Sequence, residues 1–74
     1  MFPSFIIASR NAAVYSGNDT KFETIITLDR KFRICPIFNK NWEPVIVNNY
    51  MAINCGDRIG WIDVKNLIEV KKDG

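Results

Sequence analysis

The chain has 74 residues, of which 47% are hydrophobic, 12% are aromatic and 24% are charged, with a formal net charge of +2 and no histidine. A chain of this length forms one domain near the lower size limit for a single hydrophobic core, and its composition is too apolar for intrinsic disorder. The small excess of positive charge does not by itself indicate a polyanionic partner. We therefore expect one folded domain over residues 1–74.

The sequence contains no segment with the pattern of a signal peptide or a membrane span. Residues 1–8 lack the basic start and the long apolar stretch of a signal peptide. No run reaches the roughly 20 apolar residues that a membrane helix needs. We expect a soluble chain that stays in the cytoplasm where it is made. The abundance of Asn, Ile and Lys is typical of AT-rich genomes, including those of many bacteria, their viruses and mobile elements.

The residues that usually carry catalysis or bind metals are sparse. The two cysteines, Cys35 and Cys55, have no CxxC spacing, and a four-ligand metal site is hard to assemble without histidine. We interpret both as buried free thiols, with a disulfide between neighbouring strands as the alternative. A thiol without a histidine base is a poor nucleophile, and no catalytic motif occurs elsewhere. The prediction is a protein that is not an enzyme and needs no cofactor or metal.

Turn-forming residues recur at short intervals, and the runs between them are rich in Ile, Val, Thr and Phe without helical periodicity. The long stretch 10–21 is expected to be irregular, with Val14 as its core anchor. A short strand opening on glycine and tryptophan, one tight turn and a final strand are expected near the end. The earlier strands are predicted at residues 5–9, 22–28, 32–35 and 44–47. This pattern predicts a small all-β barrel or sandwich.

Four segments, in the same order, resemble motifs of the bacterial SH3 domain family. They are Ala8–Gly17, Ile25–Leu28, Trp42–Val45, and Gly60-Trp61-Ile62 with Leu67. The resemblance covers nearly the whole chain and implies a five-stranded SH3-like barrel with one short 3-10 turn before the last strand. The distance from Trp42 to Gly60 exceeds the family pattern, and the excess falls in Val47–Cys55. We therefore expect an elongated distal hairpin there.

Exposed aromatic side chains are the best candidates for a binding site, because they offer a large contact area with a polar handle. The resemblance places Tyr15, Asn18, Lys40 and Trp42 around the groove between the RT and n-Src loops. Trp61 is expected to lie partly exposed at the start of its strand, while Ile62 faces inward. The candidate binding residues are therefore Tyr15, Asn18, Lys40, Trp42, Arg58 and Trp61. Trp42 and Trp61 could instead simply cap the barrel.

The apolar residues of the expected hairpin suggest a second surface. Tyr50, Met51 and Ile53 either fold back onto the barrel or form a surface for self-association or for a partner. Oligomerisation would add stability to so small a domain, so we expect a homo-oligomer.

These observations favour a stand-alone SH3-like binding module that acts through protein–protein contact. Its small size and genome signature suit a bacteriophage or mobile-element accessory protein that blocks a host factor. The alternative is sequestration of a small nucleotide or another anion at a subunit interface, using aromatic stacking and cationic side chains. A further alternative is weak binding to nucleic acid, which the small charge excess disfavours.

Overall fold

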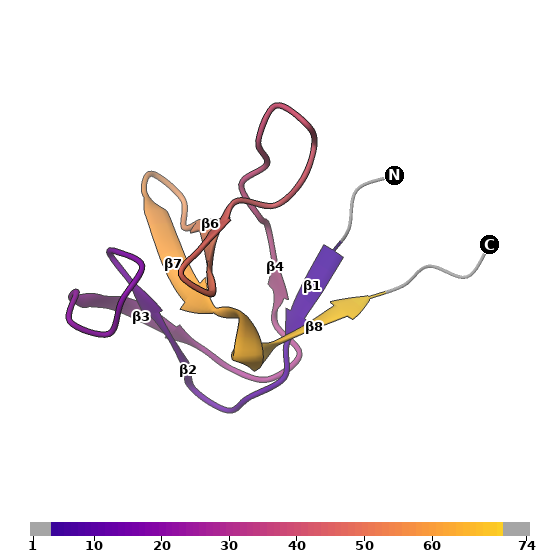
Figure 1. The fold of residues 1–74 in the computed structure, drawn as a ribbon. Helices are drawn as coiled ribbons and strands as arrows, with labels where there is room; N and C mark the ends of the chain where they lie inside the picture. The colour runs from indigo at the N-terminus through magenta and orange to yellow at the C-terminus, as the bar shows by residue number, and fades with distance from the viewer. Residues whose placement is uncertain (1–3, 71–74) are drawn as a thin grey trace.

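The chain forms short antiparallel strands and one 3-10 turn in the computed structural model, which describes residues 4–70 (Figure 1). The elements of this described part are β1 (Ser4–Ile7), β2 (Ala12–Tyr15), β3 (Thr24–Leu28), β4 (Arg33–Ile34), β5 (Ile46–Val47), β6 (Tyr50–Asn54), β7 (Ile59–Asp63), η1 (Val64–Asn66) and β8 (Leu67–Val70). The prediction of an all-β domain is confirmed. None of the helical segments in residues 4–70 has the length and apolar character needed to cross a bilayer.

The strands make two antiparallel sheets. The smaller sheet has the strand order β4-β1-β8, so that the first and last strands of the chain lie side by side. The larger sheet has the order β3-β2-β7-β6-β5. β2 lies inside the stretch that was expected to be irregular. That expectation was wrong because Ala12–Tyr15 finds partners on both sides, β3 along its length and β7 through the Tyr15–Trp61 pair.

The core lies between the sheets, and in β2 and β7 its side chains alternate with more exposed ones. Ile7 comes from the smaller sheet, and Val14, Met51 and Ile62 come from the larger one; all four are almost fully buried. Val14 is thus the core anchor that the sequence predicted, and Ile62 faces inward as expected. Each such side chain contributes about 1.5–3 kcal/mol through removal of its surface from water.

The stretch Val47–Cys55 does not form an elongated hairpin. β5 and β6 are instead joined by the two-residue turn Asn48-Asn49, in which both residues have positive φ, at 55° and 66°. Asparagine tolerates this conformation, and such a turn matches the natural twist of paired strands. Residues 39–43, between β4 and β5, form a projecting loop (Figure 1).

One extended segment belongs to both sheets and connects them. After β4, the chain continues along β6: the Asn54 amide donates to the Cys35 carbonyl at 2.9 Å, and the Ile37 amide donates to the Ala52 carbonyl at 2.9 Å. β3, by contrast, pairs only with β2 and with no strand of the smaller sheet, so the two sheets do not close into a complete barrel within the described residues.

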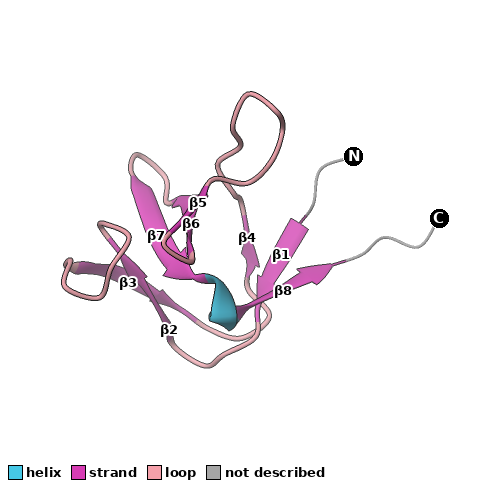
Figure 2. Cartoon of the chain, in the orientation of Figure 1, coloured by secondary structure: helices cyan, strands magenta, loops and turns pink. Residues whose placement is uncertain are grey.

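A 3-10 turn precedes the last strand, as the sequence predicted (Figure 2). Its cap is Asp63, whose Oδ1 accepts a hydrogen bond from the Lys65 amide at 3.0 Å. Asn66 ties this turn to the chain after β1: its carbonyl accepts from the Ala8 amide at 2.7 Å, and its side-chain oxygen accepts from the Ser9 hydroxyl at 2.9 Å. These bonds place β8 directly alongside β1.

Candidate functional site

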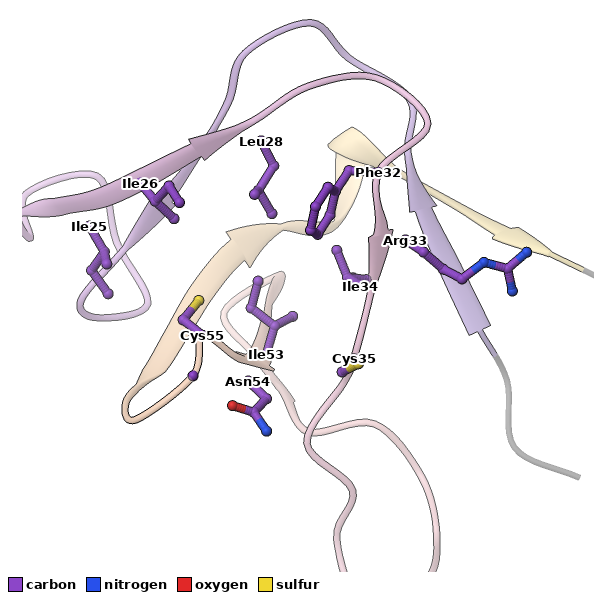
Figure 3. A pocket seen from close by; sticks show the side chains of 11 residues that line it. Ile25, Ile26, Leu28, Phe32, Arg33, Ile34, Cys35, Ile53, Asn54 and Cys55 are labelled. Carbon is purple, nitrogen blue, oxygen red and sulfur yellow. The ribbon is translucent and has the colours of Figure 1, made fainter.

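A pocket of about 410 Å³ lies at the open side of the two sheets, between β3 and β4 (Figure 3). Its volume falls within the range of pockets that hold small molecules or single side chains. Its lining is mostly apolar and comes from β3, from the chain around β4, and from the end of β6 with the turn that follows it. The lining residues are Ile25, Ile26, Leu28, Phe32, Arg33, Ile34, Cys35, Ile53, Asn54, Cys55 and Gly56.

The pocket has a buried floor and an exposed apolar rim. Ile34 and Ile53 form the floor and are 5% and 2% exposed. Ile26 and Phe32 stand on opposite sides of the mouth and remain 47% and 53% exposed. Figure 3 shows these four side chains pointing toward the space between β3 and β4, whereas Arg33 points away from it. Half-exposed apolar side chains above an apolar floor are typical of a surface that is completed by a partner.

Local sequence explains why so many apolar side chains reach one pocket. Along β4, Phe32 and Ile34 face the pocket because strand residues alternate, which turns Arg33 outward. β3 departs from alternation: Val14 pairs with Ile26 and Tyr15 pairs with Thr24, so Ile25 has no residue opposite it. This bulge allows the consecutive residues Ile25 and Ile26 both to line the pocket.

The two cysteines of the pocket are free thiols in different surroundings. Cys35 is exposed, so the prediction that it is buried was wrong, whereas Cys55 is half-buried. Burial raises the pKa of the Cys55 thiol, although the Arg58 charge and a hydrogen bond with the Gly60 backbone act in the opposite direction. The thiol is therefore held in its neutral form near pH 7, where it behaves as a small apolar group rather than as an activated nucleophile.

Three of the predicted binding residues come together on the outer face of the larger sheet. Tyr15 lies opposite Trp61 across β2 and β7. The Tyr15 ring meets the edge of the Tyr50 ring, with centroids 6.2 Å apart. The loop after β2 is held beside these rings by a hydrogen bond of 3.2 Å from the Asn48 side chain to the Asn18 carbonyl. The sequence thus identified members of one aromatic cluster, on a different face from the pocket.

The other three predicted binding residues lie in two separate turns. Lys40 and Trp42 belong to the projecting loop of residues 39–43, where the Trp42 amide donates to the Asn39 carbonyl at 3.0 Å. Trp42 is 65% exposed and has a positive φ of 62°. Arg58 lies in the turn between β6 and β7, and its carbonyl accepts from the Cys55 amide at 2.9 Å.

The structure does not place Tyr50, Met51 and Ile53 on an interaction surface. All three are buried, because β6 is an inner strand with neighbours along both edges and apolar side chains over both faces. The expected oligomer or partner surface at these residues is therefore corrected: they fold back into the domain, and Ile53 forms part of the pocket floor.

Sequence reasoning missed the remaining pocket residues. The consecutive residues Ile25 and Ile26 were the available signal for a pocket. Because strand side chains alternate between the two faces, two adjacent apolar residues cannot both enter one core from a regular strand. No family model, curated protein or solved structure matches this chain. The fold and the pocket therefore have to be interpreted from their own chemistry.

Proposed function

We propose that this chain is a non-enzymatic, SH3-like protein-binding module whose contact site is the pocket between β3 and β4. The SH3-like part of the proposal is supported by the pairing of the first and last strands, the 3-10 turn before the last strand, and the one segment that both sheets share. The domain differs from a closed barrel in that β3 and β4 are not paired with each other.

The observation that carries the binding proposal is the exposed apolar rim above a buried apolar floor. Ile26 and Phe32 expose large apolar surfaces beside a hollow that water fills poorly, because few polar groups line it. An aliphatic or aromatic side chain of a protein partner would replace that water. Burial of one such side chain contributes about 1.5–3 kcal/mol, which corresponds to roughly a tenfold to hundredfold gain in affinity.

Selection from a library of random linear peptides tests the proposal. We expect the wild-type domain to enrich peptides that contain an apolar anchor. Ile26→Lys, which places a charge at the mouth of the pocket, should lower the affinity for those peptides by about tenfold or more. Ile68→Lys is the matched control, because Ile68 is 53% exposed but lies on β8, outside the pocket.

Two results would contradict the proposal. One is the absence of any enriched apolar peptide. The other is equal binding of the selected peptides by Ile26→Lys and wild type, provided that thermal unfolding shows both to be folded.

A further inference from the structure

The free edge of β3 adjoins the pocket along its length. β3 stands at the end of the larger sheet and pairs with β2 on one side only, within the described residues. Natural edge strands are usually protected by a charge, a proline or a bulge. Thr24–Leu28 has no charge and no proline, and its one bulge is confined to Ile25. Its outer backbone groups are therefore available for hydrogen bonds with an added strand.

The pocket and this edge would be used together by an extended segment. Ile25, Ile26 and Leu28 supply both the edge strand and one wall of the pocket. In strand addition, backbone hydrogen bonds supply affinity and alternate side chains enter pockets beside the edge. One buried side chain gives only a modest affinity, so the edge supplies the further contacts that a specific complex needs.

Positive charge gathers at the end of β3. The turn Asp29-Arg30-Lys31 and the nearby Arg10 and Asn11 line a second hollow of about 480 Å³. This hollow has three cationic side chains and one carboxylate, and all of its residues are exposed. Its single carboxylate is engaged with the chain itself, since Asp29 Oδ1 accepts from the Arg30 amide at 2.7 Å. A segment that continues past β3 would meet a surface that favours acidic side chains.

We infer that the partner contributes an extended acidic segment, which pairs with the free edge of β3, inserts one apolar side chain into the pocket, and directs its carboxylates toward Arg10, Arg30 and Lys31. This inference rests on the proposed function and specifies its partner. In the register centred on Ile26, a second copy of the chain fits this edge less well. If two β3 strands paired antiparallel about Ile26, Glu23 of one copy would lie opposite Asp29 of the other, and Lys21 opposite Lys31. Such like-charge pairs are unfavourable.

Synthetic peptides with matched charges test the inference. The probe is a short peptide of alternating glutamate and valine with a central phenylalanine, and its counterparts carry lysine or glutamine in place of glutamate. A fourth peptide keeps the glutamates but has N-methylated backbone amides. Binding is measured by titration of the amide NMR spectrum. The glutamate peptide should bind with the highest affinity and should shift the NMR signals of the β3 amides. Its affinity should fall as salt is added. N-methylation should abolish its binding.

Charge reversal on the protein supplies the second measurement. Arg30→Glu should lower the affinity for the glutamate peptide by about two- to fivefold, the range expected for the loss of an exposed ion pair. Lys65→Glu is the matched control, because Lys65 is exposed in the 3-10 turn and lines neither hollow. It should leave the affinity unchanged.

The outcomes distinguish this inference from the function on which it rests. Equal affinity for the glutamate and lysine peptides would overturn the acidic partner, and unchanged affinity after N-methylation would overturn strand addition. Concentration-dependent shifts of β3 amides without peptide would assign the edge to a second copy and overturn the inference. In each case, apolar peptides selected from the library would still bind the pocket. Failure of those peptides as well would overturn the proposed function itself.

Discussion

Gly60 is a position where one added methyl group should greatly reduce the stability of the fold. It lies in β7, is buried, and pairs with Ile53. A Cβ at this position would come within overlap distance of Val14 Cγ1 and would lie 2.8 Å from Cys55 Sγ. Val14 is fully buried in the core and cannot move away freely. Gly60→Ala therefore requires strands β2 and β7 to shift apart, which loosens the core beside the pocket.

Two opposing effects determine how much Gly60→Ala lowers the free energy of unfolding. Overpacking of a well-filled core costs about 1–3 kcal/mol. Alanine reduces the conformational freedom of the unfolded chain and returns about 0.4–1 kcal/mol, because the Gly60 backbone does not need a positive φ. The net loss should be about 1–2 kcal/mol. In a domain of this size, that loss corresponds to a decrease of roughly 4–16 °C in Tm.

Urea unfolding of Gly60→Ala and Gly17→Ala measures this effect with a matched control. A Cβ at Gly17 would also meet a side chain, the Phe22 ring at 2.5 Å. However, Phe22 is 41% exposed and can rotate into solvent. Gly17→Ala should therefore cost less than Gly60→Ala. Equal stability of Gly60→Ala and wild type, or an equal loss in both variants, would refute the reasoning.

Three further predictions concern stability and reactivity. Ile62→Ala removes a fully buried side chain and should cost about 2–5 kcal/mol in urea unfolding, whereas Ile68→Ala on the exposed face of β8 should cost less than 1 kcal/mol. Burial, with a contribution from the Asp63 carboxylate, raises the pKa of the Tyr50 phenol. The unfolded chain therefore loses this proton first as pH rises above 10, so stability falls there, and Tyr50→Phe should reduce that loss. Cys55 should alkylate more slowly than the exposed Cys35 at pH 8 in single-cysteine variants, because its thiol is half-buried with a raised pKa; equal rates would contradict the described burial.

The sequence was a good guide where local pattern determined the structure. The all-β class followed from frequent turns and β-branched runs, and the predictions that Val14 and Ile62 lie in the core were correct. The 3-10 turn before the last strand was also predicted correctly. These features depend on nearby residues, so one sequence contains the information that they need.

The sequence was a poor guide where long-range pairing decided the outcome. Val47–Cys55 was read as an elongated hairpin, but the positive φ angles of Asn48 and Asn49 allow a two-residue turn that places β6 inside the sheet. Tyr50, Met51 and Ile53 were consequently assigned to a surface, although neighbours on both sides of β6 bury them. The pocket was missed because it arises where β3 and β4 fail to pair, and its local signal, the consecutive Ile25-Ile26, does not show which strands stay apart.

For the aromatic cluster, the sequence correctly predicted residues that lie close together, but their role in binding stays a prediction. Tyr15 and Trp61 do lie together, and Asn18 is held beside them by its backbone carbonyl. The Tyr15 ring, however, is already in contact with the edge of the Tyr50 ring. The pocket offers unfilled apolar surface, which is why the proposed function is assigned to it.

Isoleucine-methyl NMR of the domain with a library-selected peptide tests the central claim most directly. Side chains of the pocket carry methyl groups that should show contacts with the peptide's apolar anchor, namely Ile25, Ile26, Ile34 and Ile53. Isoleucines elsewhere on the surface should show none, namely Ile46, Ile59 and Ile68. Contacts confined to those surface isoleucines, or to the rings of Tyr15 and Trp61, would contradict the assignment of the binding site to the pocket.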